Sequence, residues 1–199
     1  MIVKLMRNIE EIVAGKLADD EVECFENYKK IKGAAEEEIQ AFEKEFDISL
    51  PEEVKELYKY KNGTAYPFSL LQTTYNDGVE ASLFLLSLDE IRHEKYHFFN
   101  ENKLMANDDF FSSEDIDKLD ERIKPFISNE RWIPFAQMPN YDIYLLLDFD
   151  PTEKGKPGQI IIYVHDPDFV YWVCDSIQEL LQNTISNLES DLFEPFFSE

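Results

Sequence analysis

Residues 159–164 read Gln-Ile-Ile-Ile-Tyr-Val, a run that is apolar at every position after the first. Successive side chains of a strand point to opposite faces of the sheet, so a strand covered on one face only would alternate between apolar and polar residues. The unbroken run therefore predicts a central strand that is buried on both faces, either by helices or by the N-terminal part of the chain.

Three strand-like segments surround this run in the last third of the chain. They are Trp132 to Phe135, Tyr141 to Phe149 and Phe169 to Cys174, and each is bounded by proline, glycine, asparagine or aspartate. This pattern is typical of short strands joined by turns. Together with the central strand, the segments predict an antiparallel meander.

Two earlier apolar runs predict a hairpin that adds to this sheet. Ser69 to Thr73 and Ala81 to Leu86 are separated by Asn76-Asp77-Gly78, and these turn residues favour a tight connection. The fold class that follows is α+β, with a mostly antiparallel central sheet of about six strands.

Apolar residues at helical spacing predict the helices that flank the sheet. The predicted helices cover residues 2–12, 36–46, 51–61, 88–99 and 177–188, with a short surface helix near 116–123. Ser87 with Glu90, and Ser176 with Glu179, have the spacing of a capping box. Gly63 is expected to end the third of these helices in a left-handed cap, and residues 100–113 are expected to form a loop.

The charge balance limits the classes of partner. The chain has 42 acidic and 19 basic side chains and a formal net charge of -23 at pH 7. Such a charge repels nucleic acids and anionic membrane surfaces, so we expect neither as a direct ligand. It would speed the encounter with a basic protein partner, although acidity can also serve solubility alone.

The cysteines and apolar runs indicate the compartment. Cys24 and Cys174 show no metal-binding spacing, which argues against a zinc–cysteine site and a disulfide scaffold. No apolar run is long enough to cross a membrane, and the opening residues lack the apolar core of an export signal. The expected location is the cytoplasm.

Two histidine motifs raise the question of catalysis. His93-Glu94-Lys95-Tyr96-His97 matches the H-E-x-x-H pattern of zinc peptidases, but no later segment offers a third ligand in a recognisable context. His165 and Asp166 are neighbours on a strand, so their side chains should point to opposite faces. We therefore expect no catalytic residues, no metal and no cofactor.

Acidic residues at the ends of the last strands are the candidate site. Because Asp148, Asp150 and Glu153 flank a strand next to the one that ends at Asp166 and Asp168, we expect an acidic rim at one end of the sheet. Solvated loops and a surface for a basic partner are both compatible with this rim. Calcium is disfavoured because the loop lacks the glycine of an EF-hand.

Several ordered motifs then resemble a known family. They are Gly33-Ala34, Ile48-x-Leu50-Pro51, Asn62-Gly63, Trp132-Ile133-Pro134-Phe135, Leu147-Asp148, the segment 155–160, His165-Asp166 and Asp175-Ser176. In this order the motifs, which extend from Lys32 to Leu188, resemble the SUKH superfamily (Smi/Knr-like domain). That superfamily includes the fungal cell-wall glucan-synthesis regulator and many bacterial immunity proteins.

The resemblance implies a SUKH-like α+β fold and a non-enzymatic, protein-binding function. One implied role is an immunity-type protein that neutralises a basic, nuclease-like toxin by occluding it; the alternative is a regulatory scaffold in cell-wall or glucan synthesis. The expected domains are an N-terminal helical extension (1–31), the SUKH domain (32–190) and an acidic-aromatic tail (191–199). The expected partner-binding residues are Tyr141, Asp142, Asp148, Asp150, Glu153, Asp166 and Asp168.

One loop departs from the family pattern. Residues 138–142, Met-Pro-Asn-Tyr-Asp, stand where relatives carry a glycine-rich turn. This bulkier loop argues against carrying over a family binding surface to this place. The insertion at residues 96–113 and the N-terminal helix extend beyond the minimal domain and are expected to tailor the choice of partner.

Overall fold

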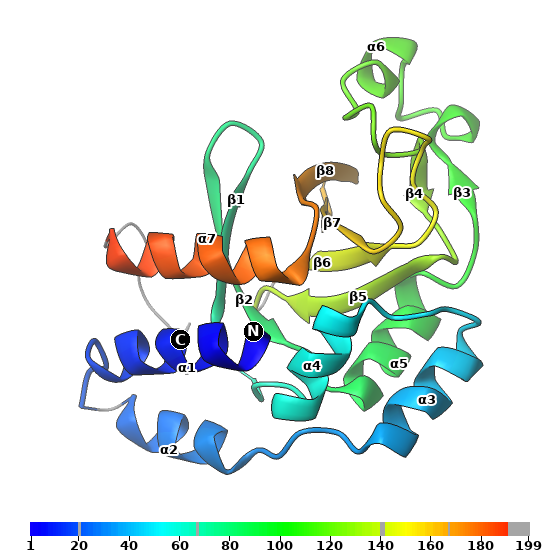
Figure 1. Cartoon of the computed structure of the whole chain (residues 1–199). Coiled ribbons are helices and arrows are strands. Elements are labelled where there is room, and N and C mark those ends of the chain that lie inside the picture. Colours follow the sequence, from blue (N-terminus) through cyan, green and yellow to red (C-terminus); the bar gives the residue numbers. More distant parts are fainter. Residues whose placement is uncertain (20, 67, 140–141, 167, 191–199) are drawn as a thin grey trace.

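A six-stranded antiparallel sheet is the centre of the described structure (Figure 1). The computed structural model describes residues 1–19, 21–66, 68–139, 142–166 and 168–190. The sheet order is β1-β2-β5-β6-β7-β8, formed by β1 (Leu71–Tyr75), β2 (Val79–Leu85), β5 (Trp132–Gln137), β6 (Ile143–Asp148), β7 (Gln159–Val164) and β8 (Phe169–Cys174). The predicted α+β fold and the antiparallel meander are therefore confirmed.

Helices and one small sheet surround this centre. The helices are α1 (Ile2–Ala14), α2 (Val22–Lys30), α3 (Glu36–Glu45), α4 (Glu52–Tyr60), α5 (Leu88–Phe98), α6 (Ser113–Ile116) and α7 (Ile177–Glu189), with a 3-10 turn η1 (Met105–Asn107). β3 (Lys103–Leu104) and β4 (Phe126–Ser128) pair with each other as a separate two-stranded sheet.

The strand β7 is buried on both faces, as its apolar sequence predicts. Ile160 and Ile162 belong to one apolar cluster, which also contains the inner faces of α1 and α7. Ile161 and Tyr163 belong to a second cluster, built largely from the segment 99–127 and from Trp132. Alternate residues of one strand thus supply two cores on opposite sides of the sheet.

Some local expectations from the sequence need correction. The polar stretch after α1 contains α2, whose Phe25 and Tyr28 are buried. The surface helix expected near 116–123 is only the short α6, because Ile116, Leu119 and Ile123 pack into the second core instead.

Gly63 serves a close approach rather than a helix cap. The helix α4 ends before it at Tyr60. A Cβ atom at this position, whose φ is 93°, would lie 2.9 Å from the backbone nitrogen of Ser87. The neighbouring Asn62 accepts a hydrogen bond from the backbone N–H of Leu88 at 2.9 Å. The Asn62-Gly63 pair therefore joins the end of α4 to the start of α5.

The exposed edge of β1 is covered by α7. The hydroxyl of Thr184 accepts a hydrogen bond from the backbone N–H of Gln72 and donates one to its carbonyl, both at 3.1 Å. Asn187 of α7 donates to the same carbonyl at 3.4 Å. Since an unpaired strand edge invites pairing with other chains, this contact closes one side of the sheet.

Replacing Thr184 by valine should therefore destabilise the fold. The change keeps the shape of the side chain but leaves the buried N–H of Gln72 without a partner and its carbonyl with only the bond from Asn187, at a cost of about 1–3 kcal/mol. Urea denaturation measures this loss. The control is Ser186→Ala on the exposed side of α7, which should leave the unfolding midpoint nearly unchanged; equal effects of the two changes would contradict the role of Thr184.

Two buried lysines differ in how well their ammonium groups are satisfied. Lys61 donates hydrogen bonds to the carbonyls of Tyr28, Lys29 and Ile31 at 3.3, 3.1 and 2.9 Å. Lys95, only 4% exposed, donates to the carbonyl of Phe99. Burial lowers the pKa of Lys95 to about 8.

This lowered pKa predicts a dependence of stability on pH. Between about pH 8 and pH 10 the unfolded chain keeps a proton on Lys95 that the folded chain releases, so Lys95 makes the free energy of unfolding rise with pH in this range. Lys95→Met should remove that contribution, whereas Lys44→Met on the surface should keep it. Denaturant titrations across this range test the difference, and identical slopes for the two variants would contradict it.

Candidate functional site

The acidic residues predicted to share one rim lie at opposite ends of the sheet. In the pairing of β6 with β7, Asp148 lies opposite Gln159 and Ile143 lies opposite Val164. The turn after β6 is therefore at one end, and the turn after β7 is at the other. Successive turns of an antiparallel meander alternate between ends, which is the reason that the expected single rim does not form.

Asp148 lies inside the protein. Its side chain is 0% exposed and accepts three hydrogen bonds, from Trp132 Nε1 at 3.1 Å, from the backbone N–H of Asp150 at 2.9 Å and from Gln159 Nε2 at 2.9 Å. Burial raises the pKa of this carboxyl group. Asp148 therefore organises the turn after β6 and offers no surface to a partner.

The other two acidic residues at this end are exposed to different degrees. Asp150 is half-buried and is bound by the ammonium group of Lys124 and, at 3.0 Å, by the amide of Asn129. Glu153 is exposed. Lysines of the same turn pair with Glu121 and Asp175, so the negative charge at this end is largely balanced.

The opposite end holds a pocket of acidic and aromatic residues, which we call the acidic pocket. It has a volume of about 330 Å³ and is lined by Asp108, Phe110, Phe111, His165, Asp166 and Asp168. The backbone carbonyl of Asp142 accepts a hydrogen bond from the backbone N–H of His165 at 3.2 Å, which places Asp142 at the same end. Tyr141 lies outside the described residues.

Hydrogen bonds fix the acidic pocket on the end of β7. Asp168 Oδ1 accepts a hydrogen bond from the hydroxyl of Tyr163 at 2.5 Å and lies 2.6 Å from His165 Nδ1. This contact with Asp168, together with the charges of Asp142 and Asp166, raises the pKa of His165. The negative charge of these carboxylates therefore favours the protonated, positively charged form of the His165 imidazole.

Phe110 gives this pocket an unusual apolar component. Its side chain is 92% exposed, although its neighbour Phe111 packs against the second core. The backbone N–H of Phe110 donates to Asp108 Oδ1 at 3.0 Å, and Lys103 pairs with the other oxygen of Asp108 at 2.8 Å. Phe110 therefore presents an apolar ring to solvent beside the carboxylates of the pocket.

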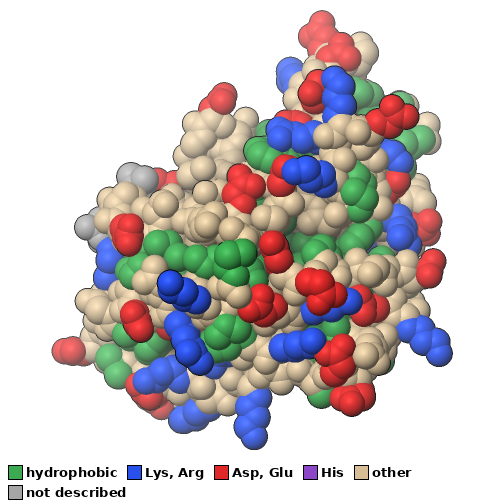
Figure 2. All heavy atoms as spheres, in the orientation of Figure 1, with side chains coloured by type: hydrophobic (Ala, Val, Ile, Leu, Met, Phe, Trp, Pro, Cys, Tyr) green, Lys and Arg blue, Asp and Glu red, His purple; other side chains and the backbone are tan. Residues whose placement is uncertain are grey.

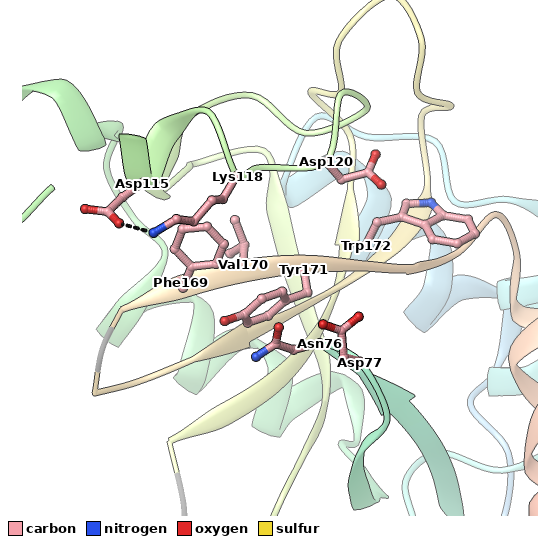
Figure 3. Close-up of a pocket in the computed structure, with 9 residues that line it drawn as sticks. All are labelled: Asn76, Asp77, Asp115, Lys118, Asp120, Phe169, Val170, Tyr171 and Trp172. Carbon is pink, nitrogen blue, oxygen red and sulfur yellow. Dashed lines mark hydrogen bonds and ion pairs between the residues drawn. The ribbon is translucent and has the colours of Figure 1, made fainter. Parts of the chain in front are cut away.

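A second hollow, the β8 groove, runs along the last strand (Figure 3). It has a volume of about 570 Å³ and is lined by Asn76, Asp77, Asp115, Lys118, Asp120, Phe169, Val170, Tyr171 and Trp172. Asp115, Lys118 and Asp120 lie on one side of β8, and Asn76 and Asp77 lie on the other. Sequence reasoning missed this groove because its walls come from two distant turns that meet only in the folded sheet.

The H-E-x-x-H histidines lie on the surface of α5. The rings of His93 and His97 are 4.6 Å apart. Glu94 accepts a hydrogen bond from the hydroxyl of Tyr144 at 2.8 Å, so its carboxylate is held against the sheet. Within the part of the chain that the structure describes, no group of three histidine, cysteine or acidic side chains is arranged to hold a metal ion.

The net negative charge is distributed unevenly. Residues 1–61 carry 10 basic and 16 acidic side chains, whereas residues 62–199 carry 9 and 26. On the face drawn in Figure 2, lysine and arginine side chains gather over α1 and α2. The excess of acid thus belongs to the part of the chain that forms the sheet and both hollows. Among the described helices, none is long and apolar enough to cross a bilayer.

The three hydrogen bonds to Asp148 predict a large effect of a small change. In Asp148→Asn, one acceptor oxygen becomes a donor that faces other donors, which should destabilise the fold by about 1–3 kcal/mol. The matched control is Glu153→Gln, which removes the same charge from the surface of the adjacent turn and should be nearly neutral. Urea denaturation at neutral pH compares them, and an equally small effect of both would show that the buried network is unimportant.

Comparison with known proteins gives the family. A search of curated proteins found no match. The family model described as SMI1 / KNR4 family (SUKH-1) matches residues 33–183, from the segment before α3 into α7. This match covers more than half of the chain and agrees with the resemblance seen in the sequence motifs. The chain therefore belongs to the SMI1/KNR4 (SUKH-1) family.

Proposed function

We propose that this protein is a non-enzymatic binding protein of the immunity type, which neutralises a basic, nuclease-like toxin by covering it. Membership of the SMI1/KNR4 family supports a partner-binding role. The observation that carries the proposal is Phe110, which is 92% exposed beside the carboxylates of the acidic pocket.

The acidic pocket suits a basic protein surface. Phe110 would insert between partner side chains, and an arginine or lysine could stack on its ring. Asp166, which is exposed, and Asp168 would then pair with neighbouring cations. An aromatic anchor supplies most of the affinity in such an arrangement, while the surrounding charges speed the encounter and exclude acidic proteins.

The cysteines support action in the cytoplasm. Cys24 is exposed, Cys174 is buried, and both are free thiols. Cytoplasmic proteins keep their thiols reduced, whereas secreted proteins tend to form disulfides.

The proposal is tested by capturing the partner from the cell that makes the protein and measuring its affinity for defined variants. Phe110→Ala should weaken binding by about tenfold or more, because truncation of a hot-spot anchor costs about 2 kcal/mol or more and about 1.4 kcal/mol corresponds to tenfold. Asp166→Asn should weaken binding less and should flatten its dependence on salt. Asparagine is the chosen replacement because it tolerates the left-handed backbone of this position, whose φ is 61°.

Glu153→Gln is the control, since it removes one charge at the opposite end of the sheet. It should bind the partner as tightly as the unchanged protein does. Inhibition of the partner's own activity in the complex would support the immunity role, and co-purification with a wall-synthesis complex would replace it by the regulatory one. A partner that is bound equally well by Phe110→Ala at all salt concentrations would contradict the use of the acidic pocket.

A further inference from the structure

The two outer strands of the sheet, β1 and β8, differ in whether another part of the chain covers their free edge. The edge of β1 is covered by Thr184 and Asn187 of α7. The strand β8 pairs with β7 on one side, and on its other side no backbone hydrogen bond joins it to any strand within the described ranges. One edge of the sheet is therefore covered and the other is open.

The open edge lacks the usual protection against pairing. Natural edge strands commonly carry lysine, proline or another charged residue that discourages the addition of a further strand. The sequence of β8 is Phe-Val-Tyr-Trp-Val-Cys, with no charge and no proline. The first strand lies close to β8 without pairing with it, and the ring centroids of Tyr75 and Tyr171 are 5.5 Å apart.

The β8 groove lies along this edge. In Figure 3 the strand forms the floor, with Asp115 and Asp120 above it and Asp77 below it. Phe169 and Tyr171 pack against each other at 5.0 Å on the floor. Walls on both sides of the edge leave a channel along β8 that an extended chain could enter.

We propose that the β8 groove binds an extended, basic segment of a protein partner, which adds to the sheet as a strand beside β8. The inference rests on the proposed partner-binding function and assigns that function a second contact. The backbone of the segment would pair with the free edge of β8. Lysine or arginine side chains at alternate positions would share one face of the added strand and point toward Asp77.

Charge favours this occupant over the alternatives. Asp77 is exposed and has no ion pair among the described residues. Asp115 is paired with Lys118 at 2.8 Å and Asp120 with Arg122 at 2.6 Å, so Asp77 is the carboxylate of the groove that is free to pair with a cation. A second copy would bring another net charge of -23, and the segment 191–199 contains three acidic residues and no basic one. Both would bring further negative charge toward Asp77, whereas a basic segment would be attracted to it.

Aromatic residues on the floor add a second preference for cations. The guanidinium of Arg122, which is paired with Asp120, lies 3.5 Å from the centre of the Trp172 ring, so this ring already carries a stacked cation from the chain itself. Tyr171 is only half-buried and offers a further ring. A bound segment would thus gain from backbone pairing, ion pairing and stacking at the same time.

The test selects ligands from a phage-displayed library of random short peptides, with the full chain as bait. The selected peptides should carry lysine or arginine at alternate positions, and their binding should slow amide hydrogen exchange in residues 169–174. N-methylation of alternate backbone amides should weaken binding by about tenfold or more in one register and little in the other, because only one edge of an added strand pairs with β8.

Two matched variants on the same hairpin locate the contact. Asp77→Asn, which keeps the left-handed backbone at φ 59°, should weaken peptide binding several-fold. Glu80→Gln, which removes an exposed charge outside the lining of the groove, should leave it unchanged. Phe110→Ala should also leave it unchanged, so failure of the groove and failure of the acidic pocket are distinguished.

Several outcomes would overturn the inference. They are the recovery of no peptide, of peptides that leave exchange in β8 unaltered, or of peptides that tolerate methylation in both registers. Faster exchange of β8 after removal of residues 191–199 would identify the tail as the occupant. A dimer whose β8 amides are protected without peptide would identify a second copy.

Discussion

The burial of β7 on both faces is the constraint on which the rest of the structure depends. Each large apolar side chain removed from water stabilises the fold by about 1.5–3 kcal/mol, and Ile160, Ile161, Ile162 and Tyr163 all require cover. α7 and α1 supply it on one face, and the segment 99–127 supplies it on the other. The regular helices α1 and α7 and the irregular segment 99–127 are therefore all parts of the core.

The burial of both faces of the central strands also limits where the sheet can contact a partner. Because both faces of the central strands are occupied, the ends and the edges of the sheet are the places where β-structure meets the surface. The acidic pocket lies at one end and the β8 groove at one edge. Both places belong to the part of the chain after position 61, in which acidic residues are in excess.

The sequence predicted regular structure better than it predicted the site. Periodicity and turn residues were sufficient for the meander, the hairpin and the long helices, and Ser87 with Glu90 forms the expected capping box. The cap at Ser176 is half formed, since Glu179 accepts from the backbone N–H of Asp175 instead. The irregular segment that contains β3 and β4 escaped prediction, because its order comes from contacts with the second core rather than from any local pattern.

The candidate site shows the same limit in another form. Asp148 looked like its acidic neighbours in sequence, but only the fold reveals that Trp132 and Gln159 enclose it. The sequence predicted Asp166 and Asp168 as surface residues because aspartate and proline are typical of turns. Nothing in the sequence distinguishes the exposed Phe110 from the phenylalanines that are buried. Exposure is a property of tertiary packing, and composition does not encode it residue by residue.

The segment 99–127 has a further consequence for how partner choice could change over evolutionary time. Met105, Ile116, Leu119 and Ile123 anchor it in the second core, while Phe110, Asp115 and Asp120 alternate with them along the chain and face the two hollows. Anchors and contact positions are thus interleaved but separate, so mutations could accumulate at the contact positions while the anchors hold their place. A lineage could in this way acquire a new binding partner without rebuilding its scaffold.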